Sequence, residues 1–300
     1  MKYGIYYAYW EKEWGGQFVP YIKKCKRLGF DILEVACGAF YLENDSFFKE
    51  LRAVAEDQGM ILTGGYGPRP EHNLASRDEA AVEKAFAFYA DMFRKMELAG
   101  IDRIGGALYS YWPVDFHAPM DKPGDTARSI ARMQRLADMA ADYGITLNME
   151  SLNRFEGYMI NEASECIDYV KAVDRPNVKV MLDTFHMNIE EDDMAEAILL
   201  AGDKLGHFHV GENNRRLPGK GGMPWYQIGS ALRAIGYDRN IVMEPFVKSG
   251  GGVGSDIKVW RDLSNGASTK MLDADAAASV AYLRNVFSGP NSDYASVLRG

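Results

Sequence analysis

Four side chains of the kinds that bind divalent cations recur at similar intervals in the second half of the sequence: Glu150, Asp183, His209 and Glu244. Successive members are 33, 26 and 35 residues apart, and each comes at the end of a short apolar run that fits a buried strand. Carboxylates packed together would repel one another unless a cation neutralised them. Three carboxylates and one imidazole suit Mn²⁺, Co²⁺ or Mg²⁺ better than a structural zinc ion, which favours thiolates.

A repeating unit of the sequence explains how these side chains could converge. An amphipathic helix, a glycine and a short apolar strand follow one another several times. Helices are predicted over residues 17–28, 46–58, 78–98 and 125–143, each followed within two residues by a glycine. Glycine is favoured just past a helix because it adopts the left-handed conformation without steric cost. Gly236 marks the same boundary before the last strand.

Eight strands are predicted, at residues 2–7, 31–35, 60–64, 103–107, 145–150, 178–183, 205–210 and 241–245. Their alternation with helices implies parallel pairing and right-handed crossovers, and eight such units favour a (β/α)8 barrel, the TIM-barrel fold. A doubly wound open sheet is the alternative, but no GxGxxG motif follows the first strand. In a barrel the carboxyl ends of the strands meet on one face, where the four candidate ligands would form a metal site.

The chain is expected to form one domain over residues 1–300, because it contains no Pro- or Ser-rich linker and no low-complexity run. The glycine-rich segment 247–260 is expected to be a mobile loop after the last strand. A net charge of −8 argues against a nucleic-acid partner, since phosphate binding needs a basic surface. It is easier to reconcile with a small neutral or cationic substrate.

The compartment can also be predicted. The three cysteines, Cys25, Cys37 and Cys166, are far apart and form no CxxC pattern, so they are expected to be reduced thiols. The first residues, MKYGIYYAYW, fit a strand better than a signal peptide. No run approaches the roughly 18 apolar residues of a membrane helix. These features predict a cytoplasmic protein with no membrane partner.

Further polar side chains lie just past the predicted strand ends. Glu156, His186 and Arg215 could hydrogen-bond a polyol, although Arg215 could instead pair with Glu212 at the surface. His207, two residues before the histidine of the candidate metal site, is expected to be a core histidine that lines the wall.

Aromatic residues cluster after the first, third and fourth strands. A wall of rings can stack against the C–H faces of a sugar, and Tyr6 and Trp112 are the preferred candidates for this contact. Most of the other rings are expected to pack in the core.

Four segments together closely resemble the ketose 3-epimerases, the D-tagatose and D-psicose (allulose) 3-epimerases among the xylose-isomerase-like barrels: NMESLNRFEGYMINE, VMLDTFHMNIEE, GHFHVGENNRRLPGKG and IVMEPFV. The likeness runs from the first strand to beyond residue 260. It implies Mn²⁺ or Co²⁺ at the four candidate ligands, with Glu150 and Glu244 as the catalytic pair. It further implies that Glu156, His186 and Arg215 contact the O1–O3 end of the sugar. Tyr6, Ala107 and Trp112 fall where the family lines its pocket.

The resemblance implies epimerisation at C3 of free ketohexoses, D-fructose with D-psicose and D-tagatose with D-sorbose. Inverting C3 requires that a proton leave one face of a planar cis-enediolate and return to the other. Two carboxylates on opposite sides can do this, one as base and the other as acid. A metal acting as a Lewis acid would stabilise the developing charge. The family also implies a homodimer or homotetramer.

Three other functions are alternatives to C3 epimerisation. An aldose–ketose isomerase on the same metal barrel is the main alternative, and it would move hydrogen between C1 and C2. A repair endonuclease on a related barrel would need a basic face and several more His and Glu ligands, which five histidines and an acidic pI do not favour. A non-catalytic sugar-binding protein would not need paired carboxylates at the metal.

Overall fold

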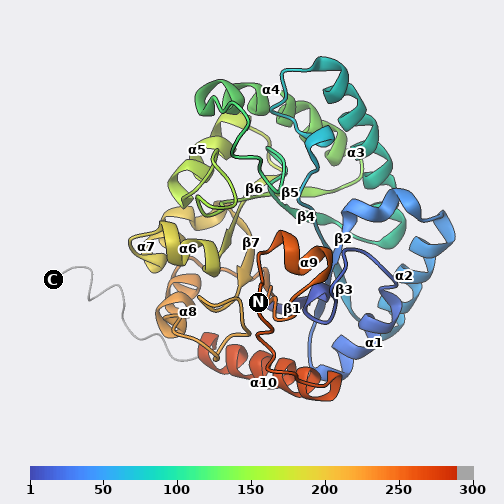
Figure 1. Cartoon of the computed structure of the whole chain (residues 1–300), viewed down its shortest axis with the longest axis vertical. Helices are drawn as coiled ribbons and strands as arrows, with labels where there is room; N and C mark the ends of the chain where they lie inside the picture. Colours follow the sequence, from blue (N-terminus) through green and yellow to red (C-terminus); the bar gives the residue numbers. More distant parts are fainter. Residues whose placement is uncertain (289–300) are drawn as a thin grey trace.

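The computed structural model describes residues 1–288, in which eight parallel strands close into a barrel in chain order (Figure 1). The last strand pairs with the first, with Met243 opposite Ile5. The predicted TIM barrel is therefore confirmed, although residues 289–300 of the predicted domain lie outside the described part. The strands are β1 Lys2–Tyr6, β2 Ile32–Ala36, β3 Ile61–Gly65, β4 Arg103–Gly106, β5 Thr146–Glu150, β6 Val178–Asp183, β7 Leu205–Val210 and β8 Asn240–Met243.

Helices surround the barrel, except for the short α9, which lies inside their ring near β1 (Figure 1). The α-helices are α1 Val19–Leu28, α2 Asp45–Gln58, α3 Glu79–Ala99, α4 Lys122–Ala141, α5 Ala163–Val173, α6 Thr184–Glu190, α7 Met194–Ala201, α8 Trp225–Ala234, α9 Gly251–Asp256 and α10 Thr269–Phe287. Short 3-10 helices span η1 Tyr7–Tyr9, η2 Cys37–Leu42, η3 Pro70–His72 and η4 Gly202–Lys204.

The helix boundaries follow from local chemistry that the sequence displays. Asn44 caps α2 by accepting hydrogen bonds from two backbone N–H groups, and Asp78 caps α3 in the same way. Gly29 and Gly100 end α1 and α3 with φ of 91° and 72°, in the left-handed region. Helix α4 begins earlier than predicted because the side chain of Asp121 caps it at Gly124 N–H.

The glycine-rich segment 247–260, predicted to be a loop, contains the helix α9. Its backbone and side chains are tied to the loop after β1. Trp14 Nε1 donates to Asp256 Oδ2 at 2.7 Å, and Val253 N–H donates to the Lys12 carbonyl at 2.9 Å. Tertiary contacts therefore fix a segment whose composition alone favours irregular backbone.

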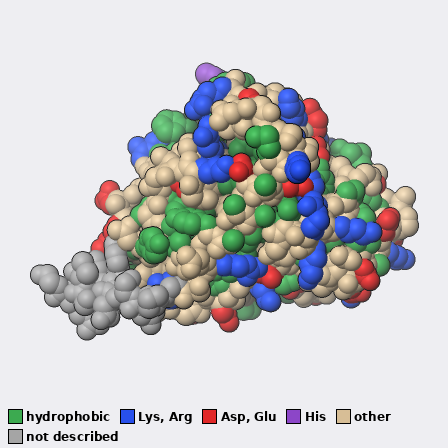
Figure 2. Space-filling model, turned by 90° about the horizontal axis from the view of Figure 1, so that it is seen from below, with side chains coloured by type: hydrophobic (Ala, Val, Ile, Leu, Met, Phe, Trp, Pro, Cys, Tyr) green, Lys and Arg blue, Asp and Glu red, His purple; other side chains and the backbone are tan. Residues whose placement is uncertain are grey.

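The surface carries charged side chains of both signs, and the cysteines are buried. On the face shown in Figure 2, basic and acidic side chains are interspersed among apolar ones. Between residues 1 and 288, no helix has the length and apolar character that a membrane span requires. Cys25, Cys37 and Cys166 are free and buried.

Candidate active site

The four predicted ligands meet at the carboxyl end of the barrel. Glu150 and Asp183 are the last residues of β5 and β6, His209 lies in β7, and Glu244 directly follows β8. Each offers a ligand atom, and these atoms lie within 4.8 Å of one another. Parallel pairing of neighbouring strands brings them together although they are far apart in the sequence.

Two observations indicate that this cluster suits a divalent cation. His209 Nδ1 is buried, lacks a hydrogen-bond partner among residues 1–288, and lies 3.6 Å from Glu244 Oε1. Burial raises the pKa of the Glu150 carboxyl well above its ordinary value, and the neighbouring Glu244 carboxylate raises it further. A cation would give the Nδ1 atom a partner and offset the repulsion among the carboxylates.

Arg215 is buried beside this cluster and does not pair with the side chain of Glu212. Its Nη1 lies 3.3 Å from Asp183 Oδ2 and 3.1 Å from Glu244 Oε2, and its Nη2 lies 3.3 Å from Glu156 Oε1. The guanidinium therefore links the metal-ligand cluster to a further carboxylate of the pocket.

Two features explain this position of Arg215: its guanidinium packs on an aromatic ring, and the Glu212 carboxylate is occupied by other donors. The guanidinium carbon lies 3.7 Å from the centroid of the Phe185 ring, which it covers. Glu212 instead accepts hydrogen bonds from the backbone of Gly219 and Met223 and from Trp225 Nε1. The surface ion pair that the sequence left open is therefore absent from the structure.

His186 is held as a neutral donor. The backbone N–H of Asn153 donates to His186 Nδ1 at 3.2 Å, so the proton of the neutral ring sits on Nε2. Burial lowers the pKa of His186, which favours this neutral form. Nε2 lies 3.8 Å from Glu150 Oε1, facing the cluster.

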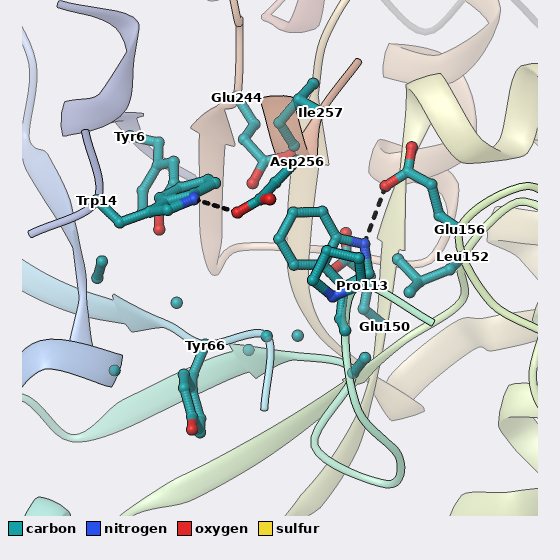
Figure 3. Close-up of a pocket in the computed structure, with 18 of the residues that line it drawn as sticks. Tyr6, Trp14, Tyr66, Pro113, Glu150, Leu152, Glu156, Glu244, Asp256 and Ile257 are labelled. Atoms are coloured by element: carbon teal, nitrogen blue, oxygen red, sulfur yellow. Dashed lines mark hydrogen bonds between the residues drawn. The ribbon is translucent and has the colours of Figure 1, made fainter. Parts of the chain in front are cut away.

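Glu156 connects the polar cluster to the aromatic wall. Trp112 Nε1 donates to Glu156 Oε2 at 3.3 Å (Figure 3), while Arg215 and Asn153 lie at the other oxygen. Burial alone would raise the pKa of the Glu156 carboxyl, but the Arg215 guanidinium and the hydrogen bonds from Asn153 and Trp112 lower it below its ordinary value.

These groups line one cavity of about 400 Å³, a size suited to a small molecule. Of the ten predicted site residues, nine line it, and Asp183 belongs to the cluster at its base. Tyr6 and Trp14 form one side of the cavity, with Tyr66 below them in the view of Figure 3. Ala107 and Trp112 line the cavity from the segment after β4.

Sequence reasoning missed Glu34, a carboxylate in the middle of β2 that is 1% exposed. Its Oε1 lies 2.6 Å from His209 Nε2 and its Oε2 lies 2.9 Å from His207 Nε2. Burial alone would raise the pKa of Glu34, but the two histidines lower it. A glutamate within the apolar run FDILEV was the available signal, because an acidic residue in a buried strand needs a partner. His207 lines the barrel interior, as predicted, and also contacts this carboxylate.

Asp256 was also missed. It lines the cavity from the end of α9, where it holds the indole of Trp14 (Figure 3). No local pattern marks it, because its place in the site depends on the fold of the segment after β8.

Known proteins resemble this chain over nearly its whole length. Residues 22–263 match the family model described as a xylose isomerase-like TIM barrel. A D-psicose 3-epimerase from Agrobacterium fabrum is 52% identical over 289 residues, which cover 96% of this chain and 100% of that protein.

Two solved structures are similar in both sequence and shape. D-psicose 3-epimerase with D-tagatose from Clostridium cellulolyticum H10 has a TM-score of 0.95 and 52% identity, covering 96% of this chain and 100% of that chain. A D-psicose 3-epimerase in the presence of D-fructose has a TM-score of 0.94 and 53% identity, with the same coverage. The resemblance recognised in the four sequence motifs is confirmed. The chain belongs to the D-psicose 3-epimerase family, ketose 3-epimerases of the xylose isomerase-like TIM barrels.

Proposed function

We propose that this protein is a metal-dependent 3-epimerase of free ketohexoses, which interconverts D-fructose with D-psicose and D-tagatose with D-sorbose. The observation that carries the proposal is the pairing of Glu150 and Glu244 in one buried cluster at the base of a sugar-sized cavity. The strands β5 and β8 that carry them are three positions apart in the ring, so the two carboxylates approach from different sides.

The metal site in this proposal consists of Glu150, Asp183, His209 and Glu244. A bound divalent cation, Mn²⁺ or Co²⁺ in our proposal, would act as a Lewis acid that stabilises negative charge on the sugar oxygens near C3. The unpartnered Nδ1 of His209 and the three carboxylates supply the nitrogen and oxygen donors that such ions bind.

The proton transfers fall to the two glutamates. The C3 proton, next to a carbonyl, leaves to one carboxylate, and the other carboxyl group gives a proton to the opposite face of the planar cis-enediolate. One base on one side could not serve both faces, whereas two positioned groups can. The reverse reaction exchanges their roles.

The polar groups beside the cluster would orient the sugar. His186 presents an N–H and Arg215 a guanidinium at the base of the cavity, and the Glu156 carboxylate can accept from a hydroxyl. The contact of Arg215 with Glu156, and the hydrogen bonds of Asn153 to His186 and Glu156, fix these groups before substrate arrives, which lowers the entropic cost of binding. Tyr6, Ala107 and Trp112 would face the remaining carbons of the chain.

The same proposal extends to assembly and compartment. We expect a homodimer or homotetramer, as the family resemblance implies. The three free, buried cysteines support a reducing, cytoplasmic location.

A single experiment tests the activity. The protein is stripped with EDTA, supplied with Mn²⁺ and incubated with D-fructose in D₂O, while NMR follows the products and the hydrogen at C3. We expect metal-dependent D-psicose with deuterium at C3, and almost no product without added metal.

The alternative function gives a different result in the same experiment. An aldose–ketose isomerase would form an aldose and exchange hydrogen at C1, and this outcome would replace the proposal. Absence of turnover with both D-fructose and D-tagatose would contradict the proposed substrates.

A further inference from the structure

A buried carboxylate lies beneath the proposed metal site and contacts one of its ligands from behind. Glu34 is carried by β2, between Tyr6 of β1 and Thr63 of β3 in the strand register. It reaches across the barrel interior to β7, where Oε1 lies 2.6 Å from His209 Nε2. None of the catalytic steps proposed above uses this residue.

The contact determines which nitrogen of His209 carries hydrogen. A carboxylate can only accept, so the short contact requires a hydrogen on Nε2. The neutral ring then has its lone pair on Nδ1, the atom that faces Glu244 and lacks a partner. If the Glu34 carboxylate turned away or were removed, neither the tautomer nor the orientation of the His209 ring would be fixed.

The carboxylate of Glu34 is itself held in place. The Thr63 hydroxyl donates to Oε2 at 2.8 Å, and His207 Nε2 lies 2.9 Å from the same oxygen. All of these groups are buried, so water cannot replace the contacts. Each oxygen of Glu34 thus has a hydrogen-bond partner, Thr63 for Oε2 and His209 for Oε1, so turning the carboxylate would break one of these contacts.

We propose that Glu34 is a positioning residue that orients His209 for cation binding, with His207 and Thr63 holding Glu34 in place. The inference rests on the proposed metal site. Carboxylates that accept from the second nitrogen of a metal-binding histidine fix the ring and make it a stronger donor. Their removal typically weakens metal affinity by about 10- to 100-fold.

A second metal site is the competing explanation, because Glu34, His207 and His209 also offer ligand atoms close together. The 2.6 Å separation of Glu34 Oε1 and His209 Nε2 argues against it. That is a hydrogen-bond distance, whereas two ligands each about 2.0–2.2 Å from one cation normally lie farther apart. The structure therefore favours a proton between these two atoms over a cation.

The test compares metal binding by variants of two buried acidic residues. Glu34→Ala removes the contact, Glu34→Gln retains an acceptor without the charge, and Asp273→Ala is the matched control. Asp273 is also buried and accepts from Trp10 Nε1 and Arg27, but it lies on α10, outside the barrel. Titration calorimetry with Mn²⁺ on metal-free protein gives affinity and stoichiometry, and thermal unfolding without metal gives stability.

We expect Glu34→Ala to raise the Mn²⁺ dissociation constant by about 10- to 100-fold, and Glu34→Gln to raise it less. Asp273→Ala should lower the unfolding temperature without changing Mn²⁺ affinity. Unchanged affinity in Glu34→Ala would overturn the inference and make Glu34 a residue of barrel stability only. If Glu34→Ala does not fold, the near-isosteric Glu34→Gln decides, and unchanged affinity there overturns the inference equally.

The remaining outcomes separate this inference from the proposed function. Two Mn²⁺ ions per parent chain, falling to one in the Glu34 variants, would establish the second metal site instead. Failure of the parent chain to bind Mn²⁺ would contradict the metal site itself. As a readout that needs no metal, ¹⁵N NMR of histidine-labelled protein, at a pH high enough that the ring is neutral, should show the Nε2–H tautomer of His209 in the parent and a mixture of tautomers in Glu34→Ala.

Discussion

The two sides of the cavity are built in different ways. At its base, Glu150 and Asp183 end strands of the closed barrel, and their neighbours His209 and Arg215 are buried. The wall is made of aromatic rings on the segments after β1, β3 and β4, together with Asp256 at the end of α9. Charge and strand register define the base, whereas apolar packing between loops defines the wall.

Under the proposed function, this difference would give the two sides separate tasks. Strand ends hold side chains more precisely than loops do, as proton transfer and metal binding require. Stacked rings tolerate small shifts, which is sufficient for apolar contact with a sugar chain. Substitutions at the base should therefore change turnover, and substitutions in the wall should mainly change the substrate affinity.

The largest effect is expected at the two glutamates. Glu150→Gln and Glu244→Gln should each abolish epimerisation, because general acid–base catalysis alone contributes about 10²- to 10⁴-fold and both residues are also proposed metal ligands. The initial rate of D-psicose formation at saturating Mn²⁺ measures this loss. Glu191→Gln is the control, since Glu191 accepts from Ala163 N–H away from the cavity. Near-normal turnover of either variant with metal bound would refute the two-base scheme.

A smaller loss of activity is expected for Arg215→Lys. Lysine keeps the charge, but its single ammonium nitrogen cannot stand at the positions of both Nη1, which contacts Asp183 and Glu244, and Nη2, which contacts Glu156. Charge-assisted hydrogen bonds contribute about 1.5–3 kcal/mol, so kcat/KM should fall by about 10- to 100-fold. The adjacent Arg216→Lys is the control and should retain kcat/KM. An equal loss of kcat/KM in both variants would show that activity depends on the conformation of the loop and not on the Arg215 guanidinium.

Whether a feature depends on local sequence or on contacts between distant segments decides how much the sequence could predict. The strands and the convergence of the four candidate ligands were predictable because apolar periodicity and helix-ending glycines are local, and parallel strands bring their ends together. The role of Glu34 could not be predicted in this way, because its contact with His209 joins strands β2 and β7 across the barrel. Helix α9 was missed for a related reason: the backbone contact of Val253 with Lys12, not local propensity, keeps that segment ordered.

In the wall, Trp112→Phe should mainly raise KM. Phenylalanine keeps an aromatic ring but loses the N–H that donates to Glu156 Oε2. A hydrogen bond to a charged group contributes about 1.5–3 kcal/mol, and at 3.3 Å this one should lie at the low end, which corresponds to a KM increase of about tenfold. Steady-state kinetics with D-fructose test this, and a fall in kcat larger than the rise in KM would place Trp112 with the groups of the base.

The smallest effect is expected for Asp256→Asn. The asparagine oxygen can still accept from Trp14 Nε1, so the wall keeps its shape although the charge is lost. KM for D-fructose should change by less than about twofold, because no charge at this position is required by our scheme. Asp256→Ala frees the indole and should raise KM several-fold. If Asp256→Asn and Asp256→Ala raise KM equally, the charge of Asp256 acts on the sugar directly. The wall would then contribute electrostatics to substrate binding as well as packing.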